Sequence, residues 1–554
     1  MTRMRLPSRS RLATFGLVGL AALIPLTVVV IFFVVPVVGM VGRGFFPDGE
    51  LDVAGVADAL LRPRVAHVVW FTLWSSSLAT ALTVLLGVPT AFVLYRLRFP
   101  GQALLRGLVT VPFVLPTVVV GVAFRTLLAG TGPLAFLGWD GTPAAIVAAL
   151  VFFNLAVVVR TVGAHWEGLD RRREEAAAAL GASPAHVLRT VTLPALVPAV
   201  VSAGTVVFLF CATAFGVVLT LGGVEYATVE TEIYLLTTQF LDLQGAAALC
   251  VLQIVFVVVL LGLTRRVGQG SASVQRTSTA VRRRPAGRDV PALLVSALVV
   301  VAVAAPLVSL VVRSLRVDGS WSLEHYRALD GTTGVLSVPV TQALENSLRV
   351  AVDATLLAVV LGGTVAVLVT RRLCTPVARR AAATFDAVFM LPLGVSAVTV
   401  GFGLLVALDT PPLDFRGSPW LVPVAQALVA MPLVVRLLVP ALRSVDERQR
   451  EAAASLGAGT LRVLRTVDLP HARRALLAAT GFAFAVSLGE FGATSFLSRP
   501  ETVTLPVAVY QLVSRPGEDN FGAALAASVV LGLVTAAVVV LVERVRGGSL
   551  GGLS

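Results

Sequence analysis

Few side chains in this sequence are placed where they could carry out covalent or metal chemistry. Its five His are scattered without the spacing of a metal site, and no cluster of His, Asp and Glu is typical of a membrane enzyme. Three Cys, an odd number without paired spacing, predict neither a disulfide framework nor a metal site. All 44 Lys and Arg residues are Arg. A P-loop is thereby excluded, because its Lys must reach the nucleotide phosphates.

Contact with a solute in transit is a second kind of chemistry, and it needs polar residues inside apolar segments, where they are costly and usually functional. Glu490 is the sharpest candidate, since a carboxylate there could pair with a cation. It could instead be a helix-packing residue bonded to Ser487 or to neighbouring backbone. Further candidates for the path are Asn154, Thr213, Ser487, Gln253 and Gln426. Each of these could equally be an interhelical hydrogen-bonding group.

Acidic residues also gather in the segment 222–245, which contains Glu225, Glu230, Glu232 and Asp242 and no basic residue. Such a segment could attract a cationic solute or the basic rim of a binding protein. It could equally be a solvated loop. The sequence leaves both interpretations open.

The elements that carry these residues are membrane spans. The 554 residues are 56% hydrophobic and only 14% charged, whereas a soluble domain has about 25% charged residues. Apolar runs of about 20 residues recur along the chain and predict an all-α integral membrane protein. About twelve spans are expected, over residues up to 41, 66–95, 103–129, 143–163, 196–221, 246–264, 290–313, 346–370, 382–408, 419–442, 473–496 and 521–542.

Charged loops predict the orientation. Residues 265–288 hold seven Arg and no acid, and the loop 371–380 is also basic, which is typical of cytoplasmic loops. The net charge of +13 therefore indicates membrane topology rather than a nucleic-acid partner. Residues 1–11 are basic and precede an apolar run that could be a signal peptide. The run is long and lacks a clear cleavage site, which favours an uncleaved first span with both termini cytoplasmic.

Two stretches of the chain repeat one another. The first motif, Glu175–Pro194, reads EAAAALGASPAHVLRTVTLP, and the second motif, Glu451–Pro470, reads EAAASLGAGTLRVLRTVDLP; 14 of their 20 positions are identical. The offset of 276 residues (175 to 451) also aligns Leu115-Pro116 with Leu391-Pro392, and Tyr234 with Tyr510. We predict two parallel six-helix repeats, 1–266 and 290–554, joined by a flexible basic linker, 267–289. Each motif lies between the fourth and fifth spans of its repeat.

Local propensities predict the shape of the motif. Ala-rich sequence with acids at its start favours a helix over 174–180, and Gly181 permits a left-handed stop. Ser183 is expected to cap a second helix that begins at Pro184 and closes at Leu193-Pro194. The product is two short helices at the cytoplasmic surface, joined rigidly to the next span. An ordinary interfacial amphipathic loop is the alternative for a single copy, but two matched copies argue against it.

The pattern E-A-A, then Gly, then L-P resembles the coupling-loop motif of permease subunits of ATP-binding-cassette importers. Fusion of two repeats in one chain, with the segments LTLGG (219–223) and SLGEFGAT (487–494), is similar to iron(III)- and thiamine-type permeases. The resemblance implies two elements that dock on a separate ATPase. Their residues are Glu175, Ala176, Ala177, Gly181 and Pro194, and Glu451, Ala452, Ala453, Gly457 and Pro470.

The same resemblance implies the partners and the setting. These are a homodimeric ATPase that holds ATP and Mg²⁺, an extracytoplasmic solute-binding protein or lipoprotein, and the lipid bilayer of a bacterial cell membrane. The chain itself is expected to bind no cofactor or metal and to catalyse no reaction. Ferric iron or thiamine is the expected solute, with molybdate, sulfate or polyamine as alternatives. A self-sufficient secondary transporter is a competing class, although the loop YRLRFPGQ lacks the G-x-x-x-D-R pattern of the major facilitator class.

Overall fold

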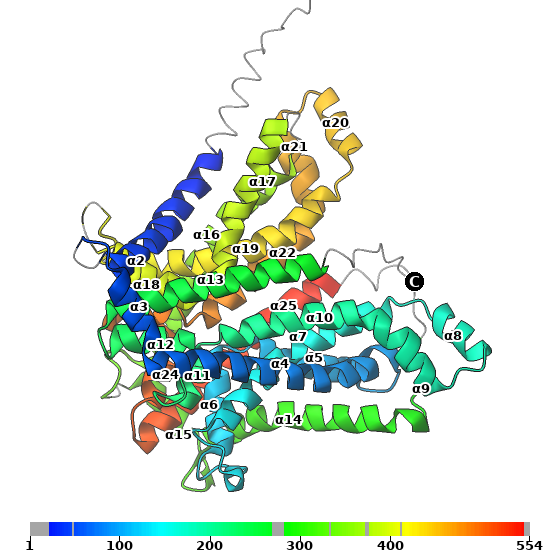
Figure 1. Cartoon of the computed structure of the whole chain (residues 1–554), viewed down its shortest axis with the longest axis horizontal. Helices are drawn as coiled ribbons and strands as arrows, with labels where there is room; N and C mark the ends of the chain where they lie inside the picture. Colours follow the sequence, from blue (N-terminus) through cyan, green and yellow to red (C-terminus); the bar gives the residue numbers. More distant parts are fainter. Residues whose placement is uncertain are drawn as a thin grey trace, which may run out of the picture. The chain divides into compact units, whose positions relative to one another are not determined.

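A computed structural model of the chain describes residues 21–46, 49–268, 282–331, 334–371, 376–409, 411 and 413–547. Helices dominate these residues, as expected (Figure 1). One two-stranded antiparallel ribbon occurs among them, in which β1 (Arg316–Val317) pairs with β2 (Ser320–Trp321). Much of the predicted linker falls outside the described residues.

The first repeat has long helices separated by short ones. The long helices are α2 (Val35–Phe45, preceded by the π turn η1, Val30–Val34), α4 (Pro63–Arg96), α5 (Gln102–Val114), α6 (Thr117–Leu128), α7 (Pro143–Glu167), α10 (Leu193–Ala212) and α13 (Leu243–Gly268). The short elements are α3 (Val53–Leu61), η2 (Ala135–Leu137), α8 (Arg172–Ala179), α9 (Pro184–Val187), η3 (Leu188–Thr192), α11 (Gly216–Gly222) and α12 (Val229–Thr238).

The second repeat follows the same order. Its long helices are α14 (Val290–Ser314), α16 (Val340–Thr370), α17 (Pro376–Met390), α18 (Ala397–Ala407), α19 (Leu421–Arg443), α22 (Leu469–Gly489) and α25 (Glu518–Gly547). Its short elements are η4 (Gly287–Asp289), α15 (Glu324–Arg327), η5 (Ala328–Asp330), η6 (Leu391–Gly394), α20 (Glu447–Ser455), α21 (Thr460–Val463), η7 (Leu464–Asp468), α23 (Thr494–Leu497), η8 (Pro500–Thr502) and α24 (Leu505–Val513).

Nine helices among the described residues are long and apolar enough to cross a membrane, or ten if the bent pair α5–α6 is one span. The predicted spans 103–129 and 382–408 are both broken at the aligned Leu-Pro dipeptides: α5 and α6 meet at 107° beside Pro116, and η6 contains Pro392. Proline removes a backbone donor and disfavours a helical residue before it. The predicted span 473–496 is α22, which has two Arg near its start and ends at Gly489.

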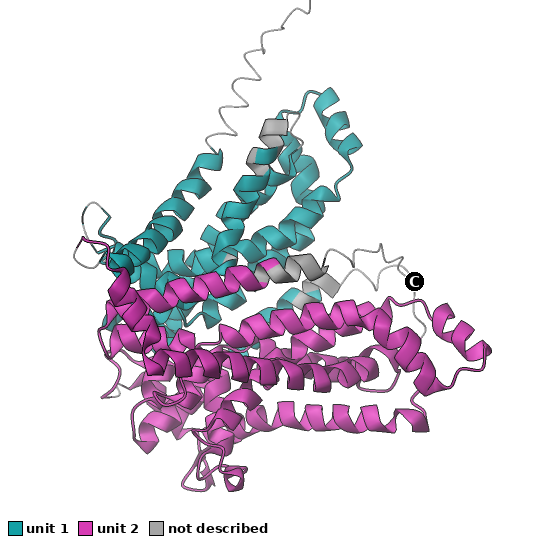
Figure 2. Ribbon diagram, viewed as in Figure 1, with its two compact units in different colours: residues 1–48, 341–507, 533–554 teal, residues 49–340, 508–532 magenta. Residues whose placement is uncertain are grey.

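The chain divides into two compact units that interleave the repeats (Figure 2). Unit 1 contains residues 1–48, 341–507 and 533–554, and unit 2 contains residues 49–340 and 508–532. Within unit 1, α2 of the first repeat packs against α18 of the second. Within unit 2, α14 of the second repeat packs against α4 and α6 of the first. The opening helix of each repeat therefore lies in the unit formed mainly by the other repeat.

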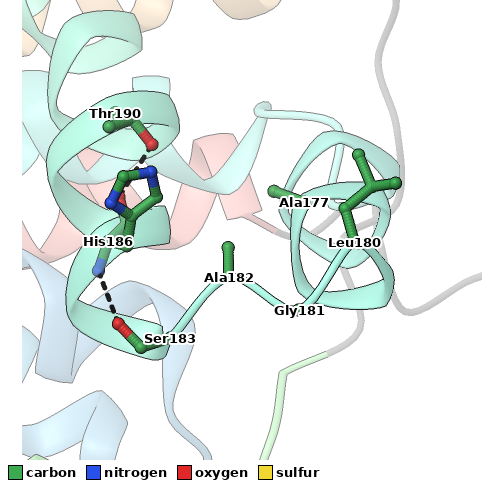
Figure 3. A pocket seen from close by; sticks show the side chains of 7 residues that line it. All are labelled: Ala177, Leu180, Gly181, Ala182, Ser183, His186 and Thr190. Carbon is green, nitrogen blue, oxygen red and sulfur yellow. Dashed lines mark hydrogen bonds between the residues drawn. The ribbon is translucent and has the colours of Figure 1, made fainter.

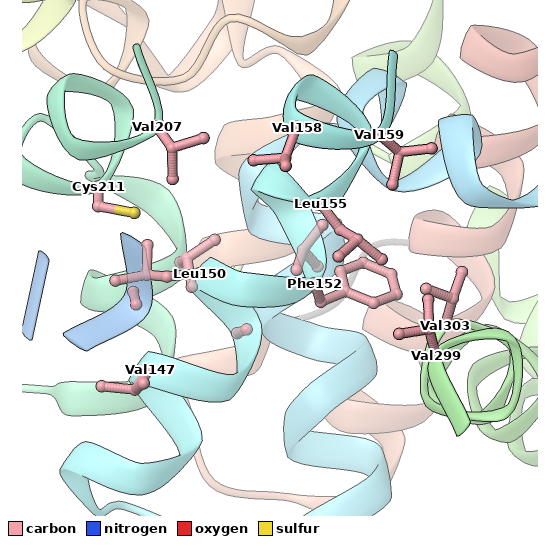
Figure 4. Packing of buried hydrophobic residues seen from close by; sticks show 14 of the residues in the cluster. Val147, Leu150, Phe152, Leu155, Val158, Val159, Val207, Cys211, Val299 and Val303 are labelled. Atoms are coloured by element: carbon pink, nitrogen blue, oxygen red, sulfur yellow. The ribbon is translucent and has the colours of Figure 1, made fainter. Parts of the chain in front are cut away.

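Helix α7 is central to unit 2, where it packs against α4, α5 and α10. Its buried residues Leu150, Leu155 and Val158 belong to one apolar cluster with Val207 of α10 and Val299 of α14 (Figure 4). Close packing rather than water exclusion holds helices together in a bilayer. This core fixes the helices that flank the first motif.

Candidate functional site

The first motif forms the two short helices that its sequence predicts. α8 ends in a left-handed turn at Gly181, whose φ is +86°. The amide of Ala182 donates to the carbonyl of Ala177 at 3.1 Å. The amide of Gly181 donates to the carbonyl of Ala178 at 3.0 Å. These two bonds are a Schellman motif, which requires a residue that adopts positive φ readily. Ser183 then caps α9 by accepting a hydrogen bond from the amide of His186.

The second motif has the same geometry. Gly457 has a φ of +82°, and the amide of Ala458 donates to the carbonyl of Ala453 at 3.0 Å. Gly459 precedes α21 where Ser183 precedes α9, so this helix has no side-chain cap. The alanines of each E-A-A segment thus provide the carbonyls that hold the turn. The two motifs differ in capping, not in the path of the backbone.

The predicted helix end at Leu193-Pro194 is wrong. A π turn, η3, continues α9 directly into α10, and the amide of Leu193 donates to the carbonyl of Leu188. The second motif does the same through η7, where the amide of Leu469 donates to the carbonyl of Leu464. The wider turn brings the chain to Pro194 and Pro470, which lack an amide hydrogen, without ending the helix. Pro184–Ala212 is consequently one continuous helix.

The tip of each motif exposes a leucine. Leu180 is 89% exposed and Leu456, its counterpart in the second repeat, is 88% exposed. In the first motif an open concavity of about 620 Å³ lies between the two short helices; its lining residues include Leu180, Gly181 and His186 (Figure 3). Each motif thus presents a large apolar side chain to solvent at the turn between its two short helices.

The first motif is fixed to the spans by Glu174. The guanidinium of Arg96, at the end of α4, lies 2.6 Å from the Glu174 carboxylate. The hydroxyl of Thr192 donates to the other oxygen of that carboxylate at 3.1 Å. Arg96 is 8% exposed and Glu174 is 24% exposed, so this ion pair is partly shielded from water. One carboxylate therefore connects α4, α8 and the π turn before α10.

The second motif is fixed by Arg450, which aligns with Glu174. Its guanidinium lies 2.7 Å from the carboxylate of Asp468 and 2.9 Å from that of Glu447, and it donates to the carbonyl of Leu442. Arg371 lies 3.4 Å from the same Asp468 carboxylate. Burial lowers the pKa of Arg450, the two carboxylates raise it, and the net direction is upward. Residues 174 and 450 directly precede the two motifs. The sequence signal for these contacts is that Glu174 and Thr192 of the first copy are replaced together by Arg450 and Asp468 in the second.

Glu490 is held by backbone and a hydroxyl rather than presented to a solute. Its side chain is 6% exposed, and its carboxylate accepts hydrogen bonds from the amides of Ala493 and Thr494 at 2.7 and 3.0 Å. The hydroxyl of Thr494 also donates to it. The carboxylate thus caps the start of α23. Of the two interpretations left open above, this geometry favours the helix-packing one.

Gln426 is the candidate path residue whose side chain adjoins Glu490, because its amide donates at 3.1 Å to the hydroxyl of Thr494, which in turn donates to Glu490. Apart from Ser487, the other candidates belong to unit 2, whereas this pair lies in unit 1. Asn154 is buried in unit 2, where its amide donates to the carbonyl of Leu150 at 3.0 Å and to the sulfur of Cys211 at 3.4 Å. Thr213 donates to the carbonyl of Leu209 within its own helix. Among the described residues the hydroxyl of Ser487 has no hydrogen-bond partner, so Ser487 contacts Glu490 only through the backbone, where the amide of Glu490 donates to the Ser487 carbonyl at 3.2 Å.

The acidic segment 222–245 is not a solvated loop. Glu230 and Glu232 lie on α12 and are buried. Arg64 makes two hydrogen bonds to the Glu232 carboxylate, and the amide of Gln253 donates to Glu230. Long-range partners that the local sequence does not reveal thus bury two of the four acids.

Comparison with known proteins agrees with this geometry. The sequence matches the family of the binding-protein-dependent transport system inner membrane component over residues 83–270 and 354–547. The chain belongs to this family. Each matched segment contains one of the two motifs. The membership decides between the functional classes in favour of an importer permease that crosses the inner membrane several times.

Relatives of this permease cover nearly its whole length. It is 30% identical over 511 residues to the thiamine transport system permease protein ThiP of Brucella abortus, with 90% of each chain covered. It is 30% identical over 461 residues to ThiP of Escherichia coli, with 81% of this chain and 83% of that one covered. A bacterial ABC transporter that imports alginate matches 48% of this chain and 97% of its own, with 16% identity and a TM-score of 0.41.

Proposed function

We propose that this permease carries thiamine across the cell membrane, driven by ATP hydrolysis on separate subunits. The observation that carries the proposal is the match to ThiP proteins over 90% of both chains. It favours thiamine over the ferric iron, molybdate, sulfate and polyamine considered above. In addition, no group of three or more His, Cys, Asp or Glu able to hold a metal ion occurs in the part of the chain that the structure describes.

In this proposal the two motifs are coupling loops for a homodimeric ATPase, which holds the ATP and Mg²⁺. Leu180 and Leu456 would enter apolar pockets of the two ATPase subunits, since burial of a leucine contributes about 2 kcal/mol. The left-handed glycine turns and the ties at Glu174 and Arg450 hold those leucines in place. Two matched loops suit a partner with two equal docking sites.

The helix Pro184–Ala212 supports a mechanical link between docking and transport. Because it runs without interruption from the coupling loop into a span, displacement of the loop must tilt or shift the span. ATP binding that draws the ATPase subunits together would therefore favour one of the inward- and outward-open states. An external binding protein or lipoprotein delivers thiamine in this scheme, and both termini are cytoplasmic.

A photo-crosslinking amino acid at Leu180 or at Leu456 tests the docking directly in cells that express the full transport system. We expect each to capture a protein that contains Walker motifs. The control is the same probe at Phe136, which is 80% exposed and lies between the predicted third and fourth spans. With the N-terminus cytoplasmic, that loop is external, opposite the side of the motifs. Capture of the ATPase from Phe136, or from neither leucine, would contradict the docking scheme.

A further inference from the structure

Two aromatic residues that are counterparts in the two repeats touch one another. Tyr234 of α12 and Tyr510 of α24 are offset by the same 276 residues as the two motifs. Their ring centroids are 6.4 Å apart, and their planes meet at 84° in an edge-to-face contact. Both residues belong to unit 2. Phe215 extends the group, since its ring centroid lies 5.4 Å from that of Tyr234.

A contact between counterparts has a geometric consequence. Because Tyr234 belongs to the first repeat and Tyr510 to the second, their contact is a place where the two repeats meet. In transporters built from repeats, the solute crosses at the interface between the repeats. The tyrosine pair consequently stands where a solute path would run.

The helices that carry the two tyrosines are anchored in matching ways. At the start of α12 the amide of Val229 donates to the hydroxyl of Thr72 on α4 at 3.0 Å. At the start of α24 the amide of Leu505 donates to the hydroxyl of Ser347 on α16 at 2.6 Å. In both repeats, therefore, a side-chain hydroxyl of a long helix accepts a hydrogen bond from the first amide of the helix that carries the tyrosine.

Each tyrosine also has a matching hydroxyl one turn further along its helix. Thr238 donates to the carbonyl of Tyr234, and Ser514 donates to the carbonyl of Tyr510, both at 2.7 Å. These bonds, with the anchors at the helix starts, place the two rings in equivalent positions. Both rings are only half-buried, so they retain surface that a ligand could contact.

The chemistry of the pair suits an aromatic cation. Ring faces of Tyr attract cations and stack on other planar rings. Glu230 lies one helical turn before Tyr234 on α12, and its buried carboxylate accepts a hydrogen bond from Gln253. We infer that Tyr234 and Tyr510 form a constriction in the solute path, and that their rings contact the aromatic cation as it passes between them. The identity of that cation rests on the proposed function.

The test is the amount of radiolabelled thiamine transported per ATP hydrolysed, measured in proteoliposomes that contain the permease with its ATPase and loaded binding protein. Tyr234→Leu and Tyr510→Leu should each lower this ratio by about tenfold, because hydrolysis continues while the cation is no longer held. Tyr234→Phe and Tyr510→Phe keep the rings and should stay within about twofold of the unaltered permease. Phe208→Leu is the matched control, since Phe208 pairs with Phe256 at 6.3 Å in the same unit without being its counterpart.

A purely structural role would lower uptake and hydrolysis together and leave their ratio unchanged, which would overturn the inference. Failure of the unaltered permease to take up thiamine would instead contradict the proposed function.

If the Leu variants do not insert, a Tyr234→Cys and Tyr510→Cys pair, made in a chain without its three native Cys, can be bridged by a short reducible reagent. The bridge should stop uptake and a reductant should restore it; full uptake through the bridged permease would overturn the inference.

Discussion

Glu174 and Arg450 occupy the same position in the two repeats and carry opposite charges. Each nevertheless connects the first short helix of its motif to the end of the following π turn. Glu174 accepts a hydrogen bond from Thr192 at 3.1 Å, and Arg450 donates to Asp468 at 2.7 Å. In both repeats the partner lies 18 residues further along the chain, at the end of the π turn. Because chemically different pairs make the same connection, we infer that the connection itself matters for the coupling loop.

Reversal of the charge at Arg450 should break this tie. Arg450→Glu places a carboxylate beside those of Asp468 and Glu447, and Asp468 is only 3% exposed. We expect a loss of about 3 kcal/mol in the free energy of unfolding and a strong fall in ATP-dependent uptake. Thermal unfolding of the detergent-solubilised permease and initial uptake rates measure the two effects.

A second substitution should rescue the first. Arg450→Glu combined with Asp468→Thr recreates the Glu–Thr pair of the first repeat, and Arg371 can then contact the new carboxylate as Arg96 contacts Glu174. Most of the lost stability and uptake should return. A double variant no better than Arg450→Glu alone would show that the two ties are not equivalent.

The glycines at the loop tips should tolerate only residues that adopt positive φ. Apart from its two chain neighbours, a Cβ at Gly181 or Gly457 would meet no atom of the described residues within 4 Å, so the cost within the chain is backbone strain of about 1 kcal/mol. Gly181→Val and Gly457→Val should nonetheless abolish transport while the chain still inserts, because the side chain would enter the docking surface. Asn is the control, since it adopts this conformation more readily. Normal uptake in both Val variants would contradict the coupling-loop assignment.

Glu490 should matter for folding rather than for the solute. In Glu490→Gln an amide group would face the N–H of Ala493 or Thr494, and the loss of a charged acceptor should cost about 2 kcal/mol of unfolding free energy. The amount of folded permease should fall while uptake per folded molecule stays unchanged. Ser487→Ala is a neighbouring control expected to be neutral. Normal folding with reduced uptake would return Glu490 to the solute path.

Features set by neighbouring residues could be predicted from the sequence. The left-handed turn at Gly181 and the Ser183 cap each depend on residues within one helical turn. The repeat could also be read directly, since 276 residues separate aligned motifs. These local rules were sufficient to predict the two short helices of each motif, and the resemblance of the motif to known permeases indicated the family.

Features that depend on distant partners could not be predicted. Glu232 is buried because Arg64, 168 residues away, pairs with it, and nothing near Glu232 indicates that pairing. The prediction that a helix ends at Leu193-Pro194 was wrong because a π turn accommodates the proline. That outcome depends on the packing of the continuous helix. The interleaving of the two repeats, with α2 against α18 in unit 1, likewise depends on tertiary contacts.

Thiamine uptake by the reconstituted permease tests the central claim most directly. Proteoliposomes would contain the full chain with its ATPase, and radiolabelled thiamine would be supplied with the external binding protein. The account predicts uptake that requires ATP and the binding protein and that is abolished by Gly181→Val. Uptake that proceeds without ATP, or no uptake of thiamine by the complete system, would contradict it.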